Sequence, residues 1–336
     1  MDIVAENPMF AAARQMLGAF AKSQIRPIAP IHDRDESMPW PLLKAAQAFG
    51  MTQTAVLDGR KKLTGVEDDP DPKKPKSQAR LSVVASEELA WGCAGICLAL
   101  GGSGLAASPV ARMGTDEQKA EFRRLLAGLD EQGRVKVAAM ALSEPATGSD
   151  ISGLTATARR DGTHWVLNGH KQWITNGASA SVYVVWAQTD AAAGRAGVRG
   201  FIVGRGTPGL VPGRKETKLG IRASETAQVH FEDCRVHADM MLGQGDNSTG
   251  LADTKKMLDS TRPVVGAQAV GIARATFEYV LDRVRAGQYG GTPLASHQRV
   301  MFELADMDME IAAARLLVHR AAWMADHHQD NVREAS

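Results

Sequence analysis

Apolar side chains recur every three to four residues in the first part of the chain, which is the spacing of amphipathic helices. The first helix is predicted to begin at Asn7 and Pro8, which suit the cap and the first helical position, and to end at Pro27 and Pro30. Its apolar face consists of Phe10, Ala13, Leu17 and Phe20. Further helices are predicted over 41–49, over 78–100 and, after a capping box at Thr115–Gln118, up to Gly128.

Near residue 135 the spacing of apolar residues shortens to every second residue, the alternation that is typical of half-buried strands. Asn168–Gly169 is a dipeptide typical of a tight hairpin turn, so the strands on either side of it are predicted to pair. Short strands without helices between them indicate an antiparallel barrel or sandwich. The predicted strands are 135–142, 164–169, 171–174, 181–188, 200–203 and 228–231.

The helical period returns near Thr254. The segment 259–263 is predicted to open a long helix, with Ser260 or Thr261 as its cap, that ends near Val284. A second long helix carries an apolar stripe typical of a bundle core, formed by Leu304, Met307, Ile311, Ala314, Val318 and Ala321. A third helix starts at 330–331 and stops at Ser336, too short to be stable alone, so we expect a chain that is cut short or completed by a partner.

These changes of period predict an α+β multidomain protein. Its parts are an all-α domain over 1–134, an antiparallel β-barrel over 135–246 and an incomplete helical bundle over 247–336. A length of 336 residues fits two domains of roughly 150 residues, or three smaller ones.

Composition and charge exclude several classes of protein. With 44% hydrophobic and 23% charged residues, the chain is not disordered, and a net charge of +1 argues against a dedicated nucleic-acid binder. No uninterrupted apolar run approaches the length of a membrane span, and Met1–Phe10 lacks the basic start of a targeting peptide, so a cytoplasmic location is expected. Cys93 and Cys97 have no histidine or further cysteine at metal-ligand spacing, so no metal site is predicted and buried thiols are the simpler interpretation.

Most motifs with known chemistry are missing from the sequence: there is no P-loop, dinucleotide fingerprint or nucleophile elbow. Two segments nevertheless offer binding groups. Leu142–Asp150 is a strand that enters a Gly/Ser/Thr turn, whose backbone N–H groups and hydroxyls suit a polar ring edge or a phosphate. In Gly169–Gly177, Trp173 can cover a flat cofactor and Thr175 can supply a hydroxyl beside it. Taken alone, an ordinary turn and a packed tryptophan are the simpler interpretation.

Together with the order of helical, β and helical parts, these segments resemble the FAD-dependent acyl-CoA dehydrogenases over nearly the whole chain. The resemblance depends on Ala141–Asp150, Asn168–Gly177, Lys218–Ser224, Phe231–Val236 and Asp259–Val265, with Met113–Lys119 in the N-terminal part. It implies FAD bound between the β-barrel and the C-terminal bundle.

The resemblance also implies roles for individual residues. The flavin would be contacted by Met140, Leu142, Ser143, Gly148, Ser149, Trp173, Ile174 and Thr175. Ser149, Asp259 and Arg262 would contact the acyl-CoA substrate, and Arg283 or Arg285 would contact the FAD of a neighbouring subunit in a dimer or tetramer. The spacing of both arginines to Tyr289 departs from the family pattern.

The implied activity is α,β-dehydrogenation of an acyl-CoA thioester to a trans-2-enoyl-CoA in fatty acid β-oxidation, with electrons passed to an electron-transfer flavoprotein. This chemistry needs a carboxylate base, which most members carry beyond the position of Ser336; at the alternative position this chain has Thr261, so no base is assigned. Two alternatives stay open: a non-catalytic acyl-CoA or flavin-binding subunit of a hetero-oligomer, and a flavin monooxygenase or oxidase on the same fold.

Overall fold

The computed structural model describes residues 8–48, 76–243 and 251–336, with side chains omitted at 48, 152 and 251–260. The chain divides into two compact units, each built from separate segments. The helical unit comprises Met1–Pro30, Val66–Cys97 and Leu258–Ser336. The sheet unit comprises Ile31–Gly65 and Leu98–Met257.

In the helical unit, α5 (Gln78–Gly92) packs between α1 and the two C-terminal helices. Phe10 and Ala13 of α1 meet Leu81 and Val84 on one side of α5, and Val83 on another side meets Ala267 and Ala322. The helices of this unit are α1 (Pro8–Phe20) with a π-helical turn over Ala21–Ile25, α5, most of α9 (Leu251–Ala286), α10 (Gln298–Asp326) and α11 (Val332–Ala335).

The predicted first helix is confirmed, because α1 begins at Pro8 and buries Phe10, Ala13 and Leu17. The predicted start of the long C-terminal helix is wrong: α9 already runs from Leu251 and carries Pro263 inside it. A proline with a helical φ removes one backbone hydrogen bond, and packing of the long helix against its neighbours outweighs that loss. The predicted caps Ser260 and Thr261 therefore lie within a helix.

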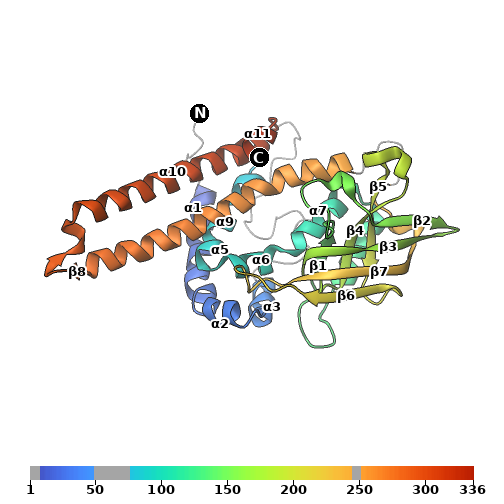
Figure 1. The fold of residues 1–336 in the computed structure, drawn as a ribbon, viewed down its shortest axis with the longest axis horizontal. Helices are drawn as coiled ribbons and strands as arrows, with labels where there is room; N and C mark the ends of the chain where they lie inside the picture. The colour runs from blue at the N-terminus through green and yellow to red at the C-terminus, as the bar shows by residue number, and fades with distance from the viewer. Residues whose placement is uncertain (1–7, 49–75, 244–250) are drawn as a thin grey trace. The chain divides into compact units, whose positions relative to one another are not determined.

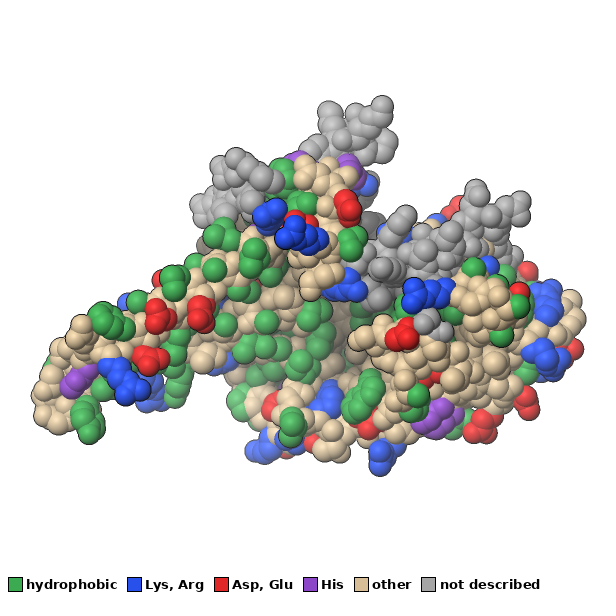
Figure 2. Space-filling model, turned by 45° about the horizontal axis from the view of Figure 1, so that its top comes forward, with side chains coloured by type: hydrophobic (Ala, Val, Ile, Leu, Met, Phe, Trp, Pro, Cys, Tyr) green, Lys and Arg blue, Asp and Glu red, His purple; other side chains and the backbone are tan. Residues whose placement is uncertain are grey.

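The α9–α10 pair runs antiparallel and is joined through a small hairpin, β8 (Gln288–Tyr289) and β9 (Thr292–Pro293) (Figure 1). The stripe of α10 is buried only near its ends, at Leu304 and Ala321, while Met307 is 42% exposed. Figure 2 shows hydrophobic side chains gathered along this pair. The exposed ones include Val265, Ile272, Tyr279, Met301, Phe302, Met309, Leu316 and Leu317.

The sheet unit is built around a curved seven-stranded sheet. Neighbouring strands follow the order β1-β4-β2-β3-β7-β6, and β5 pairs with β4 outside this order. Most pairs are antiparallel, as predicted for a barrel, but β1 and β2 each join β4 in parallel. The strands are β1 (Ala138–Ala141), β2 (Thr157–Asp161), β3 (His164–Thr175), β4 (Val182–Gln188), β5 (Val198–Gly204), β6 (Leu210–Lys215) and β7 (Thr226–His237).

The predicted hairpin at Asn168–Gly169 is wrong, because β3 runs continuously through it and the turn lies instead at Gly162 and Thr163. Gly169 sits in a bulge between β3 and β7. A Cβ there would lie 2.5 Å from the Cβ of Ala156, so glycine serves the close approach of two chain segments and not a turn.

Helices cover the sheet: α7 (Ser103–Met113) and α8 (Asp116–Leu126) share a core cluster with β1, β4 and β5. The capping box of α8 is confirmed, with both hydrogen bonds between Thr115 and Gln118 present. Gln118 also donates to the carbonyls of Asp239 and Met241. The unit also contains α3 (Trp40–Ala48), while α2 (Ala29–Arg34) and α6 (Ala94–Gly101) cross the division between units.

One described stretch, Ala94–Met113, has the length and apolar composition of a membrane-spanning helix, although it contains no long unbroken run of apolar residues. About two thirds of its most apolar window is buried inside the protein. Core helices share that property, and Ala106, Ala107 and Val110 belong to the core cluster beneath the sheet.

Candidate functional site

The loop that follows β1 is closed by one buried carboxylate. Glu144, 3% exposed, accepts hydrogen bonds from the backbone N–H groups of Thr155 (2.7 Å) and Ala156 (2.9 Å) and from the Thr155 hydroxyl (2.6 Å). Its backbone pairs with Thr147 in both directions. The loop from Glu144 to Thr155 is therefore fixed at its base, and Gly148 and Ser149 within it are exposed.

Lys171 of β3 lies behind this loop and is fully buried. Its Nζ donates to Glu144 Oε1 at 2.7 Å and to the Leu142 carbonyl at 3.1 Å. Burial raises the pKa of Glu144, but the hydrogen bonds from Lys171 and Thr155 outweigh it and bring the pKa to about 2. Burial lowers the pKa of Lys171 to about 8, against the opposing effect of Glu144. Both groups are therefore charged near neutral pH.

Trp173 leaves the regular strand two residues after Lys171. Lys171 of β3 pairs with Val229 of β7, and Ile174 pairs with Ala227. The chain therefore advances by three residues on β3 where it advances by two on β7, which is a β-bulge. This bulge sends both Lys171 and Ile174 inward, which a strand of period two cannot do, and leaves Trp173 55% exposed at φ 62°. A large side chain held exposed at positive φ costs free energy and marks a candidate binding position.

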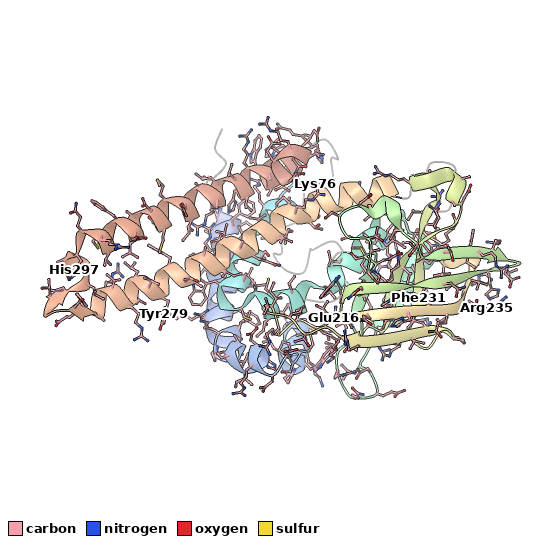
Figure 3. The ribbon with its side chains drawn as sticks, in the orientation of Figure 1. Lys76, Glu216, Phe231, Arg235, Tyr279 and His297 are labelled. Atoms are coloured by element: carbon pink, nitrogen blue, oxygen red, sulfur yellow. The ribbon has the colours of Figure 1, made fainter. Side chains whose placement is uncertain are left out.

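Glu216, which follows β6 and is labelled in Figure 3, is buried and forms a hydrogen bond with a residue of the bulge. Gln172 donates from its backbone N–H to the Ser143 carbonyl at 2.9 Å and from its side chain to Glu216 at 3.1 Å. The residue before Trp173 is thus bonded both to the loop and to the neighbouring strand region.

A second carboxylate fixes the turn after β3. Glu225 accepts from the N–H groups of Ala178 and Ser179 and from the Ser179 hydroxyl. Asn176, fully buried at φ 62°, donates to the Ala138 carbonyl, while its Oδ1 has no hydrogen-bond partner. Thr175 is half-buried, so its hydroxyl can face a ligand from a fixed backbone.

The sheet unit brings eight predicted flavin contacts onto two adjacent segments, the end of β1 with its loop and the end of β3. Gly148, Ser149 and Trp173 are exposed, while Met140, Ser143 and Thr175 are half-buried. Leu142 and Ile174 are buried in core clusters, so only their backbone groups can serve a ligand. Glu144, Lys171 and Glu225 were assigned no role from the sequence. The available signal was Lys171, a charged residue within the predicted strand 171–174.

The other predicted site residues belong to the helical unit. Asp259 lies in α9, Thr261 is half-buried there, and Arg262 is exposed with Nη1 3.4 Å from the Ser336 hydroxyl. Arg283 stacks over Tyr279, and Arg285 lies 3.9 Å from Asp282. The roles of these residues remain predictions.

Metal and thiol chemistry have little support in the part of the chain that the structure describes. No group of three or more His, Cys, Asp or Glu side chains there could hold a metal ion. Cys97 and Cys234 are buried and Cys93 is half-buried. Burial raises the pKa of Cys97 to about 12 and that of Cys234 to about 11, which makes both thiols poor nucleophiles.

Comparison with protein families accounts for nearly all of the chain. Residues 9–129 match the N-terminal domain of acyl-CoA dehydrogenases, 139–234 the middle domain and 248–336 the C-terminal domain. The mitochondrial short-chain specific acyl-CoA dehydrogenase of Rattus norvegicus is 35% identical over 325 residues, which cover 96% of this chain and 74% of the relative.

Solved structures are similar over the whole described fold. A chain in the structure of the electron transferring flavoprotein of Acidaminococcus fermentans has a TM-score of 0.85 at 29% identity and covers 99% of this chain and 83% of its own. Butyryl-CoA dehydrogenase of Megasphaera elsdenii has a TM-score of 0.83 at 31% identity, with 98% and 82% coverage. A glutaryl-CoA dehydrogenase of Mycobacterium smegmatis, in complex with FADH2, has 0.82 at 28%, with the same coverage.

Proposed function

This chain belongs to the acyl-CoA dehydrogenase family, and we propose that it binds FAD and introduces a trans double bond between the α and β carbons of a short-chain acyl-CoA. One observation carries the proposal: the three family domains match in order, and the sheet unit presents an exposed tryptophan on a bulge beside a fixed Gly/Ser turn. The names of the rat relative and of the butyryl-CoA dehydrogenase support the short chain length in this proposal.

The residues present fit an isoalloxazine ring. Trp173 offers a flat apolar face, Thr175 offers a hydroxyl beside it, and nothing lies within 4 Å of a Cβ built on Gly148, so the turn backbone is open to a ligand. Exposed aromatic rings next to a few fixed polar groups are the usual composition of a cofactor site. The FADH2 complex of the mycobacterial relative supports the same cofactor.

Bound FAD supplies the oxidant that accepts the β-hydrogen as hydride. The residues of this chain bind and orient it: Trp173 covers the ring and excludes water, while the fixed turn at Gly148 and Ser149 limits where the thioester can lie. The α-proton needs a carboxylate base. The Thr261 hydroxyl cannot act as that base, and we assign the role to no residue.

The proposed activity involves a substrate, an electron acceptor and further copies of the chain. The acyl-CoA is the substrate, and an electron-transfer flavoprotein reoxidises the flavin, which agrees with the similarity to a chain in the Acidaminococcus structure. Association into a dimer or tetramer would cover the exposed apolar side chains of α9 and α10.

The test is anaerobic titration of the purified, FAD-loaded chain with saturated acyl-CoAs of increasing length while the visible flavin spectrum is recorded. We expect bleaching, strongest with butyryl-CoA, and an enoyl-CoA product. A spectral shift without bleaching would indicate the non-catalytic binding subunit instead. Rapid oxygen consumption after reduction would indicate an oxidase or monooxygenase.

A matched pair of tryptophan variants tests the site. Trp173→Ala should weaken FAD binding about fivefold, since an aromatic stacking contact contributes about 1 kcal/mol. Trp323→Ala, which removes an indole stacked on His327 in the helical unit, should leave FAD affinity unchanged. Equal effects of both variants would contradict the assignment of Trp173 to the flavin.

A further inference from the structure

The buried pair Glu144–Lys171 connects the two segments that would contact the flavin. Glu144 closes the turn that carries Gly148 and Ser149, and Lys171 precedes the bulge that exposes Trp173. The 2.7 Å contact between them, with 1% and 0% of the two side chains exposed, is the direct side-chain link between loop and strand.

The bonding of this pair is more specific than core packing requires. Lys171 also donates to the Leu142 carbonyl, and Glu144 also accepts the two N–H groups of Thr155 and Ala156. An apolar pair of the same volume would fill the space but leave these three backbone groups without partners. Replacing a buried ion pair by apolar residues of similar volume is often neutral for stability or stabilising, so stability alone does not explain why this pair is buried.

We propose that Lys171 and Glu144 are positioning residues for the flavin: their contact holds the turn of Gly148 and Ser149 and the bulge of Trp173 in the one arrangement in which both face the isoalloxazine ring. This proposal rests on the proposed function. It assigns neither residue a contact with substrate or flavin, because both are buried behind the backbone that they hold.

The first test compares two variants that each remove the cation of a buried pair. Lys171→Met leaves the Glu144 carboxylate with its backbone donors. Arg80→Met in the helical unit does the same to Asp326, which Arg80 contacts at 2.9 Å and which keeps the N–H groups of Ala79 and Arg80. Both variants should lower the melting temperature to a similar degree. Lys171→Met alone should weaken FAD binding at least tenfold and shift the visible bands of bound flavin.

The double variant Lys171→Met/Glu144→Gln separates positioning from stability. It removes both buried charges, so its melting temperature should recover most of the loss seen with Lys171→Met. Its FAD affinity should stay at least tenfold below that of the wild type. Recovery of both properties, or wild-type affinity and spectrum in Lys171→Met, would overturn the proposal.

Hydrogen exchange on the flavin-free full chain gives a readout that does not depend on the cofactor. In the wild type, the amides of Thr155, Ala156 and Gln172 should be protected, since each is hydrogen-bonded at the junction. Lys171→Met should lower protection in 142–156 and 170–176 together, and Arg80→Met in neither. If the wild type takes up no FAD, the proposed function fails. If Lys171→Met instead lowers protection in only one of the segments 142–156 and 170–176, the coupling of the two segments is refuted.

Discussion

Glu144 of the sheet unit and the pair Glu87 and Glu88 of the helical unit are buried carboxylates that are held in different ways. In the sheet unit, Glu144 has one lysine partner and takes its remaining hydrogen bonds from the loop that it closes. In the helical unit, Glu87 and Glu88 of α5 are 2% and 4% exposed and are held by arginines: Arg274 of α9 donates to both, and Arg315 of α10 donates to Glu87.

The difference follows from the shapes of the two cations. A guanidinium is a planar fork, so Arg274 of α9 reaches both Glu87 and Glu88 of α5 at once, whereas an ammonium is a compact charge that leaves other directions at the carboxylate free for backbone donors. The arginine cluster therefore fastens helix to helix. The lysine pair fastens one loop to one strand, where the exposed Trp173 is supported.

The largest expected effect is that of Arg274→Met, which leaves two buried carboxylates short of a cation. We expect a loss of about 3–5 kcal/mol in the free energy of unfolding, measured by urea denaturation. Arg299→Met is the control, because that arginine is 91% exposed and lies 3.8 Å from an exposed Glu303, a contact that contributes at most about 1 kcal/mol. Equal stability of the two variants would show that the buried arginine cluster contributes no more to stability than the exposed Arg299–Glu303 pair.

The next effect is on the pH dependence of stability. The folded-state pKa of Glu144 is lowered from 4.5 to about 2, so its contribution is fully present above about pH 4.5 and is lost as the pH falls towards about 2. Glu144→Gln should remove this part of the loss of stability at acid pH. Melting temperatures measured across that range for both proteins check it, and parallel curves would refute it.

Asp326 of the helical unit provides the comparison of opposite sign. Burial raises its pKa from 3.8 and outweighs the hydrogen bonds from Arg80 and Ala79. An acid with a raised folded-state pKa binds protons more readily when folded, so this group favours the folded state as the pH falls through that pKa. Asp326→Asn should therefore steepen the acid loss of stability, where Glu144→Gln flattens it.

The smallest expected effect on stability is that of Trp173→Gly. Glycine tolerates positive φ, and the indole is more than half exposed, so stability should change by less than about 1 kcal/mol while FAD binding weakens. Asn176→Gly should cost more, about 1–2 kcal/mol, because Asn176 is buried and bonds to the Ala138 carbonyl. Thermal unfolding of both variants checks the order, and a larger loss from Trp173→Gly would reverse it.

Sequence reasoning succeeded where the signal was local. The capping box at Thr115 and the face of α1 depend on residues a few positions apart, and both were predicted. It failed at Gly169 and Pro263, where the partner that decides the structure is distant: Ala156 for the glycine, and the neighbours of a long packed helix for the proline.

The candidate site shows the same limit. The segments that carry Trp173, Thr175, Gly148 and Ser149 were found in the sequence, but their support by Lys171 was not. An inward lysine two residues before an outward tryptophan requires an extra residue in the strand. Only the register of β3 against β7 shows where that residue is.

The arginine cluster of the helical unit also has a consequence for synthesis on the ribosome. Glu87 and Arg274 are 187 positions apart in the chain. At about 5–20 residues per second, α9 is synthesised about 10–40 seconds after α5. During that interval Glu87 and Glu88 stay in water and oppose burial of their side of α5, while residues 98–257 of the sheet unit are completed. The helical unit therefore completes its core after the sheet segment has been synthesised, although α5 precedes that segment in the chain.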